Sequence, residues 1–393
     1  MKRFSEKLDQ IKKNGLYRKM RYLQTSQGPH IKIDGKDYLL LSSNSYLGLC
    51  NDTRLKQAAH DAIEKYGVGS GGSRLTTGSY KIHQKLEEEI AAFKGTEAAL
   101  VFNTGYMANV GTISSLADKN WVIFSDRLNH ASIIDGCRLS KAEIVVYDHC
   151  DTKDLARKVQ SYPGRQALIV TDGLFSVDGD IAPLPAIVEI AKKNNILLIV
   201  DDAHATGVLG PNGGGTADYF GLSGQIDIQM GTLSKALASE GGFIAGKRSL
   251  IDYLVNTARS FIFSTALSPA MIAISLKALD IIRTEPQRRQ TLCANTAWFR
   301  AQLRAEGFHV PESEAPIISI ILGKADLAVS FSDKLMERNI FVSAIRPPTV
   351  PPGTSRLRIS MMATHTRDDL KQALNCIAEI GQKLSVIRQG ERL

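Results

Sequence analysis

The chain has 393 residues, of which 44% are hydrophobic and 22% charged, with 32 Gly and 13 Pro. This is ordinary globular composition for two or three domains of about 150 residues each, and it excludes intrinsic disorder, collagen-like repeats and disulfide scaffolds. The net charge of +8 is spread along the chain without a basic run, which argues against nucleic-acid binding. No apolar run reaches the ~18 residues of a membrane-spanning helix, and no signal-peptide core is present. Five cysteines without paired or metal-ligand spacing predict a reducing, cytoplasmic setting and no metal site.

Helix-like and strand-like segments alternate through the first part of the chain. Apolar residues at helical spacing predict helices over residues 52–66 and 83–93. A further helix over residues 185–194 lies between two apolar runs, so the pattern is βαβ. Short, continuous apolar runs predict strands buried on both faces, as in a parallel sheet between helices. These runs are residues 98–102, 121–124, 143–147, 167–171, 196–200 and 226–230.

The last hundred residues have a helix and strand pattern of their own. It follows a long helical stretch over residues 269–283. We therefore expect an α/β protein with an N-terminal segment (1–50), a large domain (51–288) and a small C-terminal domain (289–393).

Residues 67–72 match the GxGxxG pattern of dinucleotide-binding proteins. That fingerprint requires a strand before the glycines and a helix after them. Here a predicted helix precedes them, so we interpret the segment as a flexible loop at a helix end and not as a dehydrogenase site.

Polar residues follow the ends of two predicted strands, where open α/β sheets bind their ligands. Asp201 and His204 come after residues 196–200, and Lys235 comes soon after residues 226–230. Taken alone, Asp201 is typical of a turn cap and His204 of a surface histidine. Lys235 is different, because small residues surround it and it lies between apolar segments. A desolvated lysine can form a Schiff base, and space beside it suits a large planar group.

A lysine and an aspartate at neighbouring strand ends suggest pyridoxal phosphate, which needs an imine-forming amine and an acidic partner for its ring nitrogen. His130 follows the run 121–124 and is a candidate to stack on the ring. Gly105 and Tyr106 follow the run 98–102 and open a predicted helix, whose free N–H groups suit a phosphate. Together these positions predict a pyridoxal 5′-phosphate site.

Over its whole length the chain resembles the α-oxoamine synthases, a group of the fold-type I pyridoxal-phosphate enzymes. The resemblance implies a large domain with a mostly parallel seven-stranded sheet between helices, a smaller C-terminal α+β domain, and a homodimer with shared active sites. In that dimer Ser264 and Thr265 are expected near the partner's phosphate. The matching motifs are residues 42–49, 69–74, 129–132, 200–207, 231–235 and 344–358.

Matched motif by motif, the resemblance assigns roles to residues of this chain. It implies that Lys235 is the cofactor-linking lysine, that Asp201 is the partner of the ring nitrogen and that His130 is the stacking residue. It implies further cofactor contacts from Gly105, Tyr106, Ser176, His204 and Thr232. It implies substrate contacts from Asn44, His130 and Arg358 on the amino-acid side and from Arg18, Arg346 and Thr349 on the acyl side.

The reaction implied by the resemblance condenses L-alanine with a pimeloyl thioester, carried on coenzyme A or on acyl carrier protein, in biotin synthesis. Arg346 favours this donor, because an acetyl group has no distal carboxylate to pair with it. Two alternatives remain. One is a sister synthase of the glycine C-acetyltransferase or 5-aminolevulinate synthase type, and the other is a non-catalytic cofactor-binding or acyl-carrier-binding protein.

Overall fold

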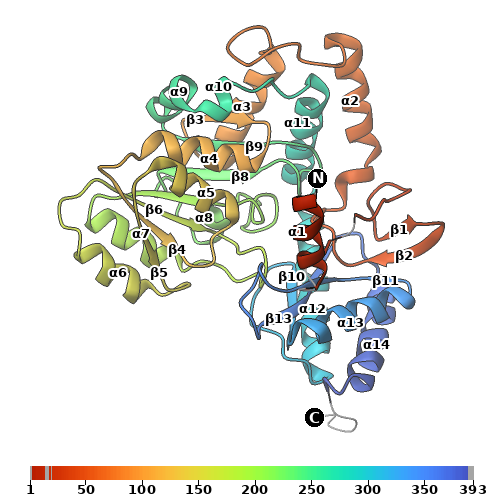
Figure 1. Ribbon diagram of the computed structural model, residues 1–393. Coiled ribbons are helices and arrows are strands. Elements are labelled where there is room, and N and C mark those ends of the chain that lie inside the picture. Colours follow the sequence, from red (N-terminus) through yellow and green to blue (C-terminus); the bar gives the residue numbers. More distant parts are fainter. Residues whose placement is uncertain (1, 14–16, 19, 388–393) are drawn as a thin grey trace.

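A seven-stranded sheet organises the larger part of the molecule (Figure 1). The computed structural model describes residues 2–13, 17–18 and 20–387. The strand order is β3-β9-β8-β7-β6-β4-β5, and β9 alone among these strands runs antiparallel to its neighbours. Six of the seven strands overlap the predicted runs, which confirms a mostly parallel sheet. The strands are β3 (Ala98–Phe102), β4 (Val122–Asp126), β5 (Glu143–Tyr147), β6 (Ala167–Asp172), β7 (Leu197–Asp201), β8 (Ile228–Thr232) and β9 (Gly242–Gly246).

Helices cover both faces of this sheet. In β7, Ile199 packs toward α4, α5, α9 and α10, whereas Leu198 and Val200 pack toward α6, α7 and α8. Over β3 and β9 that second face is covered by α3 and α11. Burial on both faces explains why the strands read as continuous apolar runs. The helices are α2 (Thr53–Tyr66), α3 (Lys81–Lys94), α4 (Gly105–Leu116), α5 (Ala131–Ser140), α6 (Thr152–Gln160), α7 (Leu184–Lys193), α8 (Thr216–Tyr219), α9 (Arg248–Thr257), α10 (Arg259–Ile262) and α11 (Pro269–Thr284).

Two strands depart from the sequence reading. The prediction of burial on both faces is wrong for β5, because β5 is the edge strand, and its Ile144 and Val146 are 38% and 45% exposed. The strand β9 was not predicted, because its glycines at both ends look like a loop. The glycine loop at residues 67–72 is as expected, since α2 ends at Tyr66 and Gly67 has the positive φ of 80°.

The smaller C-terminal domain is built on a second sheet, of order β10-β13-β12. Its helices pack on one another and on this sheet. The central strand β13 carries Arg356 and Arg358, and Arg358 lies opposite Ser319 on one neighbour and Ser343 on the other. The elements are α12 (Pro286–Ala305), β10 (Ile317–Gly323), α13 (Ala325–Glu337), β11 (Ile340–Phe341), β12 (Ser343–Ile345), β13 (Ser355–Ser360) and α14 (Arg367–Lys383).

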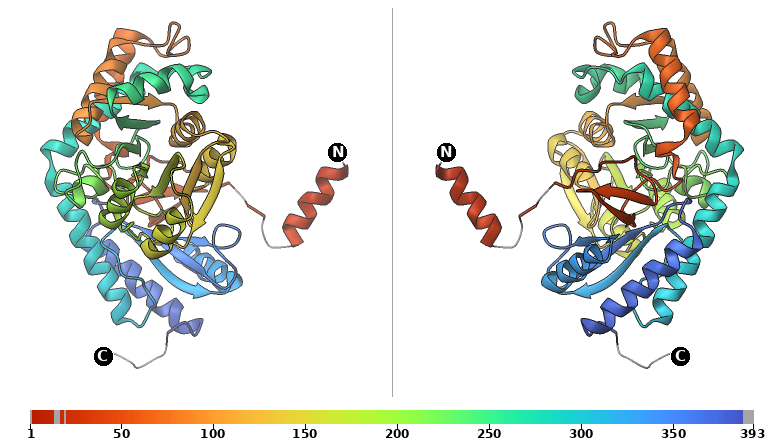
Figure 2. Two further views of the ribbon diagram at one scale, coloured as in Figure 1. Left: turned by 90° about the vertical axis from the view of Figure 1, so that its left-hand side faces the viewer. Right: turned by 90° about the vertical axis from the view of Figure 1, so that its right-hand side faces the viewer.

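The N-terminal segment joins the small domain and not the large sheet. The hairpin of β1 (His30–Ile33) and β2 (Lys36–Leu40) forms a three-stranded sheet with β11, which pairs in parallel with β2. A 3₁₀ turn, η1 (Leu49–Asn51), leads to α2. The first helix, α1 (Lys2–Lys13), projects from the body (Figure 2). Within the described part of the chain, no helix combines the length and the apolar character needed to cross a membrane.

Candidate active site

The carboxyl ends of the parallel strands meet at one edge of the large sheet, where they enclose a cavity of about 180 Å³. Several strands contribute a polar residue at or soon after their carboxyl ends, because parallel strands place these ends at the same edge. Seven of the residues singled out from the sequence line this cavity: Gly105, Tyr106, His130, Asp201, His204, Thr232 and Lys235.

Lys235 reaches the cavity from the turn that follows β8. Its Nζ lies 3.4 Å from the Thr232 hydroxyl, at the end of the same strand. Burial lowers the pKa of Lys235, and the negative charge of Asp201 opposes this effect only in part. A lowered pKa increases the fraction of neutral amine, which is the form that attacks a carbonyl carbon. The site therefore holds an activated primary amine.

Asp201 ends β7 at the floor of the cavity and is almost fully buried. One of its carboxylate oxygens accepts a hydrogen bond from Asn109 Nδ2 (2.7 Å) and the other from the backbone N–H of Ala203 (2.8 Å). Its neighbour across the sheet is Asp172, at the end of β6. Burial and the charge of Asp201 raise the pKa of Asp172 well above its usual range, so Asp172 favours its neutral form.

His130 caps the start of α5, and its ring stands at the cavity. Ring atom Nδ1 lies 2.7 Å from the Ser132 hydroxyl, and the backbone N–H donates to Asp172 (2.7 Å). The contact with Ser132 holds the ring, and the bond to Asp172 holds the backbone of His130. The exposed ring can therefore cover a planar group held between Lys235 and Asp201.

The N-terminus of α4 closes the other end of the cavity. The first-turn N–H groups of a helix have no partner within the helix and favour an anion. A side chain at Gly105 would place its Cβ 2.5 Å from Thr232 Cγ2 and 2.9 Å from Met230 Cε. Only glycine allows this close approach of the helix to β8. A phosphate fits here, within reach of Thr232.

His204 is buried, and a buried tyrosine holds it. The hydroxyl of Tyr46 lies 2.7 Å from Nδ1 of His204. Burial, with the positive charges of Lys235 and Arg358, lowers the pKa of His204 well below its usual range, so the ring is neutral. The alternative reading of His204 as a surface histidine does not hold, and its role as a cofactor contact stays a prediction.

Arg358, Ser176 and Asn44 form a second group beside the cavity. Arg358 Nε donates to the Ser176 carbonyl (2.6 Å), and Nη2 donates to the Asn44 amide oxygen (3.2 Å). Its Nη1 donates to the Ser360 hydroxyl (2.7 Å). None of these three partners is an anion, so the guanidinium keeps a charge that can bind a carboxylate.

The three acyl-side residues predicted from the resemblance lie together in a larger, separate cavity of about 1190 Å³. Arg18 and Thr349 are exposed there, and Arg346 Nη2 donates to the Tyr17 carbonyl at 3.5 Å. Arg21 also lines this cavity and stacks on the ring of Phe341 at 5.0 Å.

Sequence reasoning missed Tyr46, Asn109, Asp172 and Arg21. The first three are buried polar groups that bond to predicted residues, and no local pattern reveals such long-range partners. Tyr46 and Asp172 do lie in or beside recognised motifs, at residues 42–49 and after the run 167–171. Arg21 lies three residues beyond Arg18, a spacing that is compatible with one helical face but not diagnostic.

The sequence pattern of aminotransferase class I and II matches residues 36–377. The chain belongs to this family. Relatives with full-length similarity are 8-amino-7-oxononanoate synthases from Lysinibacillus sphaericus (53% identical, covering 98% of this chain and 99% of the relative) and from Citrifermentans bemidjiense (50% identical, covering 98% and 100%).

Solved structures of family members share the fold. A serine palmitoyltransferase from S. paucimobilis, solved with bound PLP, has a TM-score of 0.93 at 33% identity over 98% of both chains. An 8-amino-7-oxononanoate synthase from Francisella tularensis has a TM-score of 0.77 at 33% identity, over 89% of this chain and 99% of its own. The expected fold-type I architecture is confirmed.

Proposed function

We propose that the chain is a pyridoxal-phosphate-dependent, decarboxylating acyltransferase that condenses L-alanine with a pimeloyl thioester, the reaction of 8-amino-7-oxononanoate synthase in biotin synthesis. The observation that carries the proposal is the meeting of the Lys235 amine, the Asp201 carboxylate and the His130 ring at one cavity. Similarity to 8-amino-7-oxononanoate synthases at 53% and 50% identity over the full length selects this reaction among those of the family.

The cavity fits pyridoxal phosphate in each of its parts. Lys235 would hold the aldehyde carbon, Asp201 the ring nitrogen and the α4 N-terminus with Thr232 the phosphate, while His130 and Ala203 enclose the ring. In this proposal His204 and Ser176 would lie on the side of the cofactor ring that carries its hydroxyl group. When bound, the cofactor accepts the electron pair left on the substrate α-carbon.

The chain's own groups then manage the protons and the substrate. Arg358 binds the alanine carboxylate by its guanidinium fork, beside the Asn44 amide. Lys235 Nζ removes the α-proton, and Asp201 keeps a proton on the ring nitrogen. The α-carbon forms a bond to the thioester carbonyl carbon, and the C–S bond breaks to release a thiolate, which takes a proton from solvent to become the thiol. The carboxylate leaves as carbon dioxide, and a proton from Lys235 Nζ replaces it.

The larger cavity suits the acyl chain. Pimelate carries a carboxylate far from its thioester, and a carboxylate without a partner is costly to desolvate. Arg346 and Arg18 provide two cations in that cavity, and Thr349 lies at its rim.

We also propose a cytoplasmic homodimer. All five cysteines are free thiols, which supports a reducing compartment. Thr265 pairs with Ser73 next to the glycine loop, and its carbonyl accepts a hydrogen bond from Asn103. In the proposed dimer this segment, with Ser264, lies at the partner's phosphate.

The deciding experiment is a matrix of amino acids against acyl donors, read by product mass. Alanine with pimeloyl-CoA or pimeloyl carrier protein should give the 8-amino-7-oxononanoate mass at the highest rate. Faster turnover with glycine and acetyl-CoA would establish a sister synthase instead. Absence of product, together with absence of α-proton exchange on alanine, would indicate a non-catalytic binding protein.

A further inference from the structure

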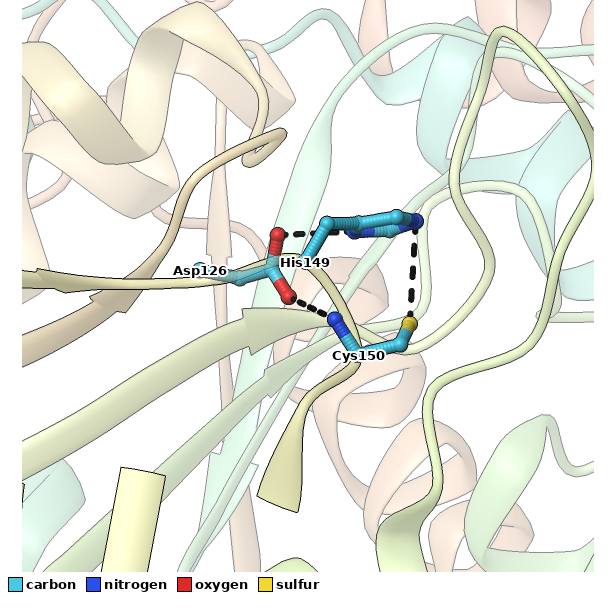
Figure 3. A group of neighbouring side chains, drawn as sticks. All are labelled: Asp126, His149 and Cys150. Carbon is cyan, nitrogen blue, oxygen red and sulfur yellow. Dashed lines mark hydrogen bonds and ion pairs between the residues drawn. The ribbon is translucent and has the colours of Figure 1, made fainter. Parts of the chain in front are cut away.

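A charged cluster outside the cavity joins three loops at the carboxyl edge of the sheet. Figure 3 shows two of its members, Asp126 and His149, beside Cys150. Its centre is His149, which follows β5. His149 Nδ1 lies 2.9 Å from a carboxylate oxygen of Asp126, the last residue of β4. His149 Nε2 lies 2.6 Å from a carboxylate oxygen of Asp180, in the loop after β6. The ring also packs edge-on against Phe175 of that loop, with centroids 4.5 Å apart.

The ring of His149 is an imidazolium cation. Each nitrogen faces a carboxylate, which only accepts hydrogen bonds, so both nitrogens must carry a proton. Burial opposes the charge, but the hydrogen bonds to Asp126 and Asp180 outweigh it and raise the pKa of His149 far above its usual range. Such a ring has no lone pair for a metal ion, although the Cys150 thiol lies 3.7 Å from Nε2. The cluster therefore acts as an ionic clamp, in which one cation holds two carboxylates.

The loop that His149 holds is the one that carries Ser176. On its other side the small domain holds the same loop: Ser319 donates to the Val177 carbonyl (2.8 Å), and Arg356 pairs with Asp178. Arg358 donates to the Ser176 carbonyl itself. The loop is thus fixed between one cation of the large domain and two of the small domain.

We propose that His149 is a positioning residue for amino-acid recognition: it holds the Ser176 loop against the end of β4, and the Ser176 carbonyl in turn orients the guanidinium of Arg358. The assignment of Arg358 to the substrate carboxylate rests on the proposed function. The positioning of the loop itself does not.

The physical reason is the position of the two carboxylates. Asp126 is buried and also accepts the backbone N–H groups of Leu128 and Cys150, so it is a fixed anchor. Asp180 is 30% exposed, and without the cation it can turn to water. The loop then loses its connection to the end of β4, although the bond from Gly173 N–H to the Asp201 carbonyl remains, and Arg358 loses the fixed direction of its Nε bond. A binding group that its neighbours already hold in one direction loses less conformational freedom when the ligand binds, so its loss of orientation lowers affinity.

The test uses His149→Gln in the full-length enzyme. Glutamine keeps a donor for one carboxylate but cannot bridge two, and it carries no charge. Asp148→Asn is the matched control, because it breaks the exposed Arg127–Asp148 pair at the same strand edge, one residue away, without touching the loop.

The first measurement is hydrogen exchange of residues 173–182, without cofactor. In wild type the loop is closed by Phe175 N–H to the Asp180 carbonyl (2.9 Å) and Gly179 N–H to the Phe175 carbonyl (3.0 Å). We expect exchange in this segment to rise ~10-fold in His149→Gln, with β6 and β7 unchanged, since the loop opens locally. Asp148→Asn should match wild type.

The second measurement is the alanine dissociation constant of the loaded enzyme, followed by visible absorbance without acyl donor. We expect it to rise ~10-fold in His149→Gln, the loss of roughly one well-oriented hydrogen bond, while the KM for the acyl thioester changes less than about twofold. Unchanged exchange and unchanged alanine affinity, with only a lower melting temperature, would reduce His149 to a structural role and overturn the proposal.

Two further outcomes separate a failure of the proposed function from a failure of the positioning role of His149. If wild type shows no response to alanine, the proposed function fails, and hydrogen exchange alone judges the positioning of the loop. If His149→Gln does not fold, Asp180→Asn replaces it, because its amide oxygen can still accept from His149 but without charge. That variant should show both effects in weaker form, and the absence of both would overturn the proposal.

Discussion

Single residues at the strand ends decide the chemistry, and Lys235 is the first to test. Lys235→Ala removes the one amine that lines the described cavity. We expect turnover to fall by several orders of magnitude and the visible absorbance of the lysine-linked cofactor to disappear, because no imine can form there. Borohydride reduction followed by peptide mass spectrometry checks this. Cofactor trapped on another lysine of the variant would contradict the assignment.

The role of Asp201 is tested by the substitution Asp201→Asn, which removes the negative charge and keeps the shape of the side chain. In Asp201→Asn the amide cannot keep the ring nitrogen protonated, so withdrawal of electrons from the α-carbon weakens. We expect α-proton exchange of alanine in deuterated water to slow by roughly 100-fold or more, while the cofactor still binds. Near-normal exchange, measured by NMR, would show that another residue holds that nitrogen.

Arg346 separates the proposed reaction from its relatives. Because Arg346 is only half-buried, Arg346→Ala should cost about 2 kcal/mol with a pimeloyl donor, at the low end for loss of one partner of a charge pair. An uncharged acyl thioester of equal length should lose far less, and alanine affinity should not change. The specificity ratio of the two donors is the readout, with Arg18→Ala as the companion variant. An unchanged ratio would mean that Arg346 only supports the turn in which Thr349 N–H bonds to its carbonyl.

The sequence predicted residues at strand ends well, since one buried strand followed by a polar residue is a local pattern. Lys235, Asp201, His130 and His204 all reach the same cavity. It did not predict Asn109 or its bond to Asp201, 92 positions away. Pairs of this kind depend on how distant elements pack, and packing has no signature in a short window.

At the scale of elements, the contact between the start of α3 and the segment before α11 is expected to depend on pH. His83 Nδ1 accepts the Tyr80 N–H (3.2 Å), and Nε2 donates to the Leu267 carbonyl (3.0 Å), which ties α3 to the segment before α11. Burial, with the nearby charge of Arg74, lowers the pKa of His83 to about 4. The unfolded chain, with a histidine pKa of ~6.5, therefore binds a proton first as the pH falls.

Stability from His83 is thus complete above pH ~6.5 and decreases toward pH 4. We expect the free energy of unfolding to lose about 2 kcal/mol from this residue between pH 7 and pH 5. Urea unfolding of wild type and His83→Gln measures it, because the variant should lack this part of the pH dependence. His60→Gln, on the exposed face of α2, is the control and should behave as wild type.

Elements also show where periodicity misleads. A continuous apolar run indicates burial but not how many neighbours a strand has, so β5 at the sheet edge looked like a central strand. β9 has the opposite problem, because Gly242 and Gly246 give a loop-like composition to a strand that is fully buried. A Cβ at Gly242 would lie 2.6 Å from the Gly105 Cα, so tight packing at the α4 N-terminus requires the glycine.

At the scale of the whole molecule, the N-terminal segment forms part of the wall of the larger cavity. Leu8 and Ile11 of α1, together with Tyr17, Arg18 and Arg21, line that cavity, and α1 projects from the body of the molecule (Figure 2). A chain lacking residues 1–21 should keep its melting temperature within a few degrees and should still bind cofactor and alanine, because little buried surface is removed. Its KM for the pimeloyl donor should rise ~10-fold or more. Loss of cofactor binding would contradict this division of roles.

The pairing of β2 with β11 joins positions about 300 residues apart, and no sequence pattern predicted it. Such contacts bring the two ends of the chain to the same small domain. The family resemblance predicted a large and a small domain. The residues alone could not show that the N-terminal strands belong to the small domain.

The placement of Arg358 on β13, outside the large sheet, has a consequence for how this enzyme can evolve. The groups that would hold the cofactor come from one domain, and the cation that would bind the amino-acid carboxylate comes from another, where it contacts the loop at Ser176. Mutations in β10, β12 or β13 would therefore change the affinity for the amino acid while the residues that line the cofactor cavity stay in place. Selection can then act on amino-acid binding in the small domain without altering the groups that would hold the cofactor.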